Sequence, residues 1–276
     1  MASPVTLSRR AVAAGFFAGY AAAAFSAEAA PIHTDANGLV VEIVKVRSGE
    51  VFIPAYLARP AAGGRHPAVI VVNEVFGIHD YIKDVCRRLA KRGFVAIAPA
   101  YFSRVGDPAP LTDYGEIMKI VDAASDPQVL GDTGAALTFL QAAAYADASK
   151  IAITGFCWGG RIVWLACERF PAIKAGVAWY GQLAPRPEDS PQKLWPIDHA
   201  AELKAPVLGL YGGQDPFSQA VPAMREAMAR AGKPGAIVVY PDAGHGFHAD
   251  YRSSYVEADA LDGWAKMLAF FAEHGV

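Results

Sequence analysis

Cys157 is the residue of this sequence that is best placed to act as a nucleophile. Residues 155–160 read Gly-Phe-Cys-Trp-Gly-Gly and stand between a predicted strand and a predicted helix. This is the Gly-x-Ser-x-Gly nucleophile elbow with cysteine in the serine position. Such a turn places the side chain at a helix N-terminus, where the dipole favours a thiolate and a developing oxyanion. Taken alone, the pattern fits equally well a small buried cysteine in an ordinary strand-to-helix turn.

Two polar residues further along the chain supply the partners that a catalytic cysteine needs. Asp215 follows a predicted strand that ends at Tyr211, and His245 follows one that ends near Tyr240. The order nucleophile, acid, histidine is that of the α/β-hydrolases. His245 would be the base toward the thiol, and Asp215 would fix its tautomer and orientation. Each could instead be an ordinary loop or helix-cap residue, but their joint order and placement favour a triad.

The rest of the chain contains the strands and helices needed to hold these residues at one edge of a sheet. Continuous apolar runs are typical of strands buried on both faces, and helical patterns separate most of them. The predicted strands are residues 39–46, 51–58, 68–72, 94–98, 150–154, 175–179, 207–211 and 237–240. The predicted helices are residues 80–92, 114–124, 132–145, 158–170, 222–231 and 254–273. This order predicts an α/β-hydrolase fold: an N-terminal antiparallel hairpin, then a mostly parallel sheet with helices on both faces.

Composition agrees with a globular enzyme and argues against several other classes. The chain has 276 residues, 53% of them hydrophobic, and a formal net charge of -2 at pH 7. No basic excess points to nucleic acid. The cysteine count of three is odd and no CxxC pair occurs, so no disulfide framework is expected, and Cys86 and Cys167 fall in helical patterns as structural residues. His248 lies near His245 without a further ligand, so no metal is expected.

The first 29 residues have the pattern of an export signal. Arg9 and Arg10 precede an Ala-rich apolar run, and Ala-Glu-Ala at 27–29 resembles a cleavage site. The paired arginines favour a twin-arginine route to a bacterial periplasm. An uncleaved anchor or a disordered start is the alternative, but the run is short for a span of about 20 residues. We therefore expect one catalytic domain over residues 30–276, with no stable membrane anchor after cleavage.

Four motifs spread over the predicted domain resemble the dienelactone hydrolases (carboxymethylenebutenolidases). They are residues 73–77 (Asn-Glu-Val-Phe-Gly), 155–160, 213–215 (Gly-Gln-Asp) and 243–247 (Ala-Gly-His-Gly-Phe). The members of this family are cysteine hydrolases that open cyclic enol-lactones. The resemblance therefore implies a cysteine hydrolase that works as a monomer without metal or organic cofactor. It also implies that Glu74 lies near Cys157 and helps to generate the thiolate when substrate binds.

Glu74 has its own physical interest, because it directly follows a predicted buried strand. A solvated charge is not expected there by default, so a carboxylate facing a cleft is more plausible than one in the core. If Glu74 reaches Cys157, it favours the thiol while ionised, and it can take the thiol proton once repositioned. The alternative is a loop glutamate turned to water.

Further site residues follow from the elbow and from the resemblance. One oxyanion donor should be the backbone N–H of Trp158, and the resemblance gives Val75 as the other. The family holds a substrate carboxylate with two arginines, and Arg104 matches the first of them. Ala249 occupies the position of the second, and Arg252 could replace it or be a solvated surface charge.

The expected ligand is a small anionic lactone or ester, bound in a pocket beyond the strand ends. Aromatic residues that follow strand ends should wall this pocket, namely Phe76, Phe102, Trp158, Tyr180 and Phe247, and the Pro-rich segment 184–196 should border it. A carboxylesterase or thioesterase with other substrates is a close alternative. A redox-active thiol protein would have no need of Asp215 and His245, and a non-catalytic relative would have lost a triad member.

Overall fold

The computed structural model describes residues 31–276, and the predicted export signal at residues 1–29 lies outside the described residues. Eight strands form one sheet in the order β1-β2-β4-β3-β5-β6-β7-β8. β1 and β2 form an antiparallel hairpin, β2 pairs antiparallel with β4, and all later neighbours are parallel. The strands are β1 (Leu39–Ser48), β2 (Val51–Pro60), β3 (His66–Val72), β4 (Val95–Pro99), β5 (Ala146–Phe156), β6 (Gly176–Trp179), β7 (Val207–Gly212) and β8 (Gly235–Tyr240).

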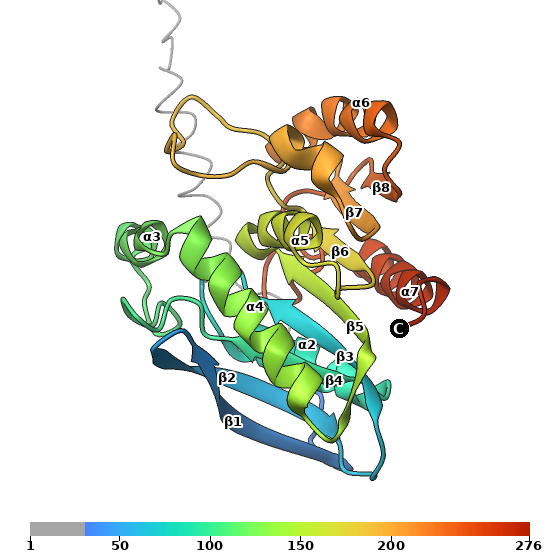
Figure 1. The fold of residues 1–276 in the computed structure, drawn as a ribbon. Helices are drawn as coiled ribbons and strands as arrows, with labels where there is room; N and C mark the ends of the chain where they lie inside the picture. The colour runs from blue at the N-terminus through green and yellow to red at the C-terminus, as the bar shows by residue number, and fades with distance from the viewer. Residues whose placement is uncertain (1–30) are drawn as a thin grey trace, which may run out of the picture.

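Helices cover the sheet on both faces, as expected for parallel strands that are apolar throughout. In Figure 1, α4 and α5 cross one face and α2 lies on the other. The helices are α2 (Asp80–Lys91), α3 (Tyr114–Ala123), α4 (Asp126–Ala142), α5 (Trp158–Arg169), α6 (Val221–Ala231) and α7 (Glu257–Glu273), with 3-10 turns η1 (Pro196–Glu202) and η2 (Pro216–Ala220). The five residues of β4 and all six of β7 are buried, so the core lies along the middle of the sheet. The predicted α/β-hydrolase architecture is confirmed.

Several predicted boundaries were wrong by a few residues. Helix α4 begins at Asp126 rather than 132, because the Ser125 hydroxyl accepts a hydrogen bond from the Gln128 N–H and Pro127 suits the first turn. Helix α2 begins at Asp80 as predicted and ends at Lys91, one residue early. The last helix begins at Glu257 instead of 254. These differences lie at element ends, where local capping decides the boundary.

Candidate active site

The backbone around Cys157 forms a strained turn between β5 and α5. Cys157 has φ 55° and ψ -117°, a conformation that a side-chain-bearing residue rarely adopts. Its N–H donates to the carbonyl of Trp179, on the neighbouring strand β6. A Cβ on Gly159 would lie 2.5 Å from the carbonyl oxygens of both Val72 and Asn73, and one on Gly155 would lie 2.6 Å from the carbonyl oxygen of Gly159. The two glycines therefore let the turn pack directly against β3, and the sequence pattern does form an elbow.

The structure brings Asp215 and His245 together beside this turn. His245 Nδ1 lies 2.6 Å from Asp215 Oδ2, and both residues are buried. The other carboxylate oxygen of Asp215 accepts from the Phe217 N–H at 2.9 Å, which caps η2. Asp215 is thus a helix cap and a histidine partner at once. The cap fixes the carboxylate, and the carboxylate fixes the ring.

The pKa of His245 depends on both Asp215 and Cys157. Burial by itself lowers the pKa of His245, but the charges of Asp215 and Cys157, with hydrogen bonds to both, raise the pKa to about 10. An imidazolium is therefore favoured next to the sulfur. This arrangement supports a thiolate nucleophile and supplies an acid for a leaving group.

Glu74 is fully buried in a polar cluster formed with His79, Tyr251 and Arg252. Tyr251 Oη donates to Glu74 Oε2 at 2.6 Å, and His79 Nε2 lies 3.3 Å from the same oxygen. Burial raises the pKa of Glu74, but the charge of Arg252 and the contacts with His79 and Tyr251 outweigh it and lower the pKa to about 2. Glu74 does not turn to water. It is held as a carboxylate and in this arrangement is a poor proton acceptor.

The two expected oxyanion donors belong to elements that meet at the cysteine. Trp158 is the first residue of α5, where backbone N–H groups have no partner within the helix. Val75 follows β3, and both residues line the same cavity as Cys157 and His245. The cavity has a volume of about 640 Å³.

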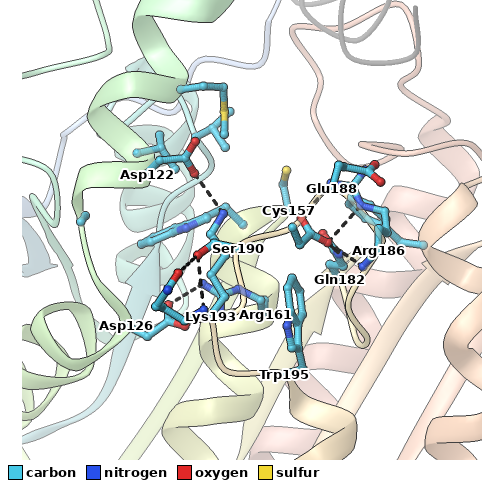
Figure 2. A pocket seen from close by; sticks show the side chains of 18 of the residues that line it. Asp122, Asp126, Cys157, Arg161, Gln182, Arg186, Glu188, Ser190, Lys193 and Trp195 are labelled. Atoms are coloured by element: carbon cyan, nitrogen blue, oxygen red, sulfur yellow. Dashed lines mark hydrogen bonds and ion pairs between the residues drawn. The ribbon is translucent and has the colours of Figure 1, made fainter. Parts of the chain in front are cut away.

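The segment after β6 forms one wall of this cavity, as the Pro-rich composition predicted. It contributes seven lining residues between positions 184 and 196: Arg186, Glu188, Asp189, Ser190, Gln192, Lys193 and Trp195. In Figure 2, Arg186 and Glu188 lie on one side of the Cys157 sulfur, and Ser190, Lys193 and Asp126 lie on the other. Asp122 and Arg161 also line the cavity. Helix α3 supplies Tyr114, Met118 and Val121.

The arginines expected to bind a substrate carboxylate are placed elsewhere. Arg104 forms a two-bond ion pair with Asp132, at 2.6 and 2.7 Å, and is not among the described residues that line the cavity. Arg252 is 1% exposed, neither solvated nor a cavity-lining residue in the described chain. Its guanidinium stacks on Phe76 at 4.9 Å and its Nε donates to Tyr251 Oη. Arg252 therefore acts on Glu74, and the structure assigns neither arginine to the cavity.

Most of the aromatic residues that we expected to line the cavity instead pack behind its lining residues. Trp158 lines it, whereas Tyr180 packs edge-on against His245 with ring centroids 5.1 Å apart, and Phe247 packs on Tyr180. Phe102 packs on Trp158 at 4.9 Å. These rings pack directly or indirectly against His245 and Trp158. Sequence reasoning missed Tyr114 and Arg161 as lining residues, since nothing in a helical pattern shows which turn faces a distant loop.

Other sequence predictions can be placed in the described part of the chain. Cys86 and Cys167 are fully buried in helices, and burial raises the pKa of both thiols. His248 Nδ1 lies 2.6 Å from Tyr81 Oη in the core, where burial lowers its pKa to about 3. Among residues 31–276 no group of three or more His, Cys, Asp or Glu side chains could hold a metal ion, and none of the described helices is long and apolar enough to cross a membrane.

The strand order, the elbow and the triad define the class of protein as an α/β-hydrolase. The sequence model of the dienelactone hydrolase family matches residues 53–275. The chain belongs to the dienelactone hydrolase family, and it is an enzyme of the carboxylic ester hydrolase class.

Individual relatives agree with this assignment. A candidate carboxymethylenebutenolidase of Methylorubrum extorquens is 49% identical, over 100% of this chain and 96% of its own. One of Escherichia coli K12 is 43% identical, over 93% of this chain and 96% of its own. The crystal structure of a candidate dienelactone hydrolase from Klebsiella pneumoniae matches with a TM-score of 0.81 and 45% identity, over 85% of this chain and 99% of that chain.

Proposed function

We propose that this protein hydrolyses a carboxylic ester or enol-lactone through a thioester formed on Cys157. The observation that carries the proposal is the position of His245, which is hydrogen-bonded to Asp215 on one side and interacts with Cys157 on the other. A redox-active or ligand-binding thiol would need no oriented histidine of this kind.

The reaction follows from these positions in two halves. The Cys157 sulfur attacks the acyl carbon, the carbonyl oxygen becomes an oxyanion, and the N–H groups of Trp158 and Val75 stabilise it. His245 then gives its proton to the leaving oxygen, and the C–O bond breaks to leave a thioester. In the second half, His245 takes a proton from water and the hydroxide attacks the thioester. The C–S bond then breaks, which releases the carboxylic acid and restores the Cys157 thiolate beside the protonated His245.

Glu74 acts in this proposal as a gate for the thiolate. As a buried carboxylate it opposes a second negative charge in its neighbourhood. A substrate that disturbs its contacts with Tyr251 and Arg252 would reposition it and change its charge. Turnover and the rate of thiol alkylation should both change in Glu74→Gln, and an unchanged pair of rates would rule out the gate.

Steady-state hydrolysis of a panel of esters and lactones tests the proposed function. We expect Cys157→Ala to lose at least about 10³-fold in kcat/KM on every substrate that the wild-type enzyme turns over, because the covalent route is gone. Alkylation of the wild-type enzyme by iodoacetamide should have the same effect. Cys167→Ala is the matched control, since that thiol is buried away from the cavity. Full activity in Cys157→Ala would refute the proposal.

A periplasmic carboxylesterase or thioesterase of other substrate range uses the same chemistry and differs only in what the cavity accepts. The expectation of an anionic substrate was based on Arg104 and Arg252, neither of which lines the cavity among the described residues. The residues that do line it therefore decide the substrate class.

A further inference from the structure

The cavity at Cys157 is large and has several aromatic walls. Its volume of about 640 Å³ falls within the roughly 300–1,000 Å³ typical of sites for drug-sized ligands. The rings that line it are those of Tyr114, Trp158, Trp195 and Phe217, and Met118, Val121 and Val75 add aliphatic surface. A ring-bearing substrate would replace water on these surfaces and gain the free energy of apolar burial.

The charged residues of the cavity are paired with one another. Arg161 makes a buried two-bond ion pair with Asp126, at 2.6 and 2.9 Å. Lys193 reaches Asp122 on α3 at 3.0 Å, as Figure 2 shows. Arg186 lies 3.2 Å from an oxygen of Asp189 and 3.4 Å from one of Glu188.

Asp189 binds both the backbone and the side chain of Arg186. Its Oδ2 accepts from the backbone N–H of Arg186 at 2.8 Å and from the Gln182 side chain at 2.6 Å. Burial raises the pKa of Asp189, but the contacts with Arg186 and Gln182 outweigh it and lower the pKa, so the carboxylate stays ionised. The guanidinium also stacks on Phe217, which packs against His245 at 5.1 Å.

The charge balance of the cavity is unfavourable for an anion. Four acidic and three basic side chains line it, apart from the triad, which leaves an excess of one negative charge. A substrate carboxylate would have to displace an aspartate from its arginine or lysine, and the displaced carboxylate would remain nearby as a like charge. An uncharged substrate has no such cost.

We infer that the cavity selects uncharged esters or lactones with a bulky ring-bearing group and discriminates against substrates that carry a carboxylate. Asp189 and Asp122 are the specificity-determining residues, because each neutralises a cation that could otherwise bind an anion. This inference rests on the proposed cysteine hydrolase, whose site the substrate must reach.

A pair of esters that differ by one terminal carboxylate tests the inference on the wild-type enzyme. 4-Nitrophenyl valerate and 4-nitrophenyl hemiglutarate have the same leaving group and similar acyl length, but the second ends in a carboxylate. We expect kcat/KM to favour the neutral ester by about tenfold or more, and the preference to shrink in high salt. We also expect kcat/KM to be higher for 4-nitrophenyl 3-phenylpropanoate, which carries a ring, than for 4-nitrophenyl acetate. Equal or reversed values in either pair would overturn the inference.

Variants of the two aspartates test whether they cause the preference for neutral esters. Asp189→Asn keeps the shape of the side chain and leaves Glu188 as the one carboxylate partner of Arg186, so the neutral-to-anionic ratio should fall by about threefold or more. Asp122→Asn should also lower the neutral-to-anionic ratio, because it removes the carboxylate that pairs with Lys193. Glu226→Gln is the control, because it removes the same charge from an exposed ion pair with Arg230 on α6. A ratio that stays at the wild-type value in both aspartate variants would overturn their role.

Failure of this inference is distinguishable from failure of the proposed function. If the hemiglutarate is the better substrate and Cys157→Ala abolishes the hydrolysis of both esters, the cysteine mechanism stands and the charge preference is wrong. If Cys157→Ala retains both activities, the cysteine mechanism itself is wrong.

Discussion

At the scale of single residues, the role proposed for His245 predicts the pH range of the reaction. Its pKa of about 10 means that the imidazolium persists well above the 6.5 of an unperturbed histidine. We therefore expect kcat/KM for an alkyl ester, whose leaving group needs a proton, to fall with an apparent pKa near 10 on the alkaline side. A pH–rate profile measures it. In Asp215→Asn the fall should move to lower pH, and a wild-type fall near pH 7 would contradict the assignment.

A second prediction at this scale concerns the contribution of Glu74 to the free energy of unfolding. Its folded-state pKa of about 2 lies below the reference value of 4.5, so its stabilisation is present above pH 4.5 and is lost as pH falls toward 2. The difference corresponds to about 3 kcal/mol. We expect Glu74→Gln to lower the free energy of unfolding by about this amount at pH 7, and by progressively less as the pH drops below 4.5.

Urea denaturation at a series of pH values measures this effect. Glu226→Gln, in an exposed pair on α6, should change the unfolding free energy by less than about 1 kcal/mol at every pH. A cost of Glu74→Gln that does not vary with pH would show that Glu74 acts through packing and not through its charge.

At the scale of elements, the elbow depends on the close approach of α5 to β3. Gly159→Ala would place a Cβ 2.5 Å from two backbone carbonyl oxygens, which cannot move without shifting β3. We expect a loss of about 3 kcal/mol in unfolding free energy and a large loss of activity, because the nucleophile and the oxyanion loop are displaced together. Gly131→Ala in α4, where a Cβ has nothing within 4 Å, should be neutral or slightly stabilising. Equal effects of the two changes would contradict this account.

The elements themselves could largely be predicted from the sequence. A parallel strand buried on both faces, such as β7, is apolar at nearly every position, and that pattern needs no knowledge of the neighbours. The start of α4 was missed because its apolar residues do not form one stripe, and only the Ser125 cap marks its beginning. The turn η2 was missed as well, since five residues are too few for a periodic pattern.

At the scale of the whole molecule, the cavity depends on contacts between distant segments. Asp126 at the start of α4 pairs with Arg161 of α5 and accepts from the Leu194 N–H, and Arg161 donates to the Leu194 carbonyl. We expect Asp126→Ala to cost about 3 kcal/mol, because it leaves a buried guanidinium unpaired, and to speed proteolysis within residues 184–196. Denaturation and limited proteolysis measure these effects, and a cost under about 0.5 kcal/mol with unchanged cleavage would contradict the role of this joint.

The same scale explains what the sequence could not predict about the site. The residues proposed for the triad and the oxyanion hole follow strand ends, and the fold brings strand ends together, so their positions were predictable. The cations of the cavity were not, because Arg161, Arg186 and Lys193 lie in a helix and a long loop whose meeting depends on tertiary packing. Arg104 matched a family position in the sequence, yet its neighbour in the fold is Asp132.

The central claim is that Cys157 carries the acyl group. Rapid mixing of the enzyme with a slowly released aryl ester, acid quenching, and mass spectrometry of the digested protein test it directly. The account predicts one acyl group per chain, attached to the peptide that contains Cys157, formed in a burst and absent from His245→Ala. An acyl group on a serine, or turnover with no acylated peptide at any time, would contradict it.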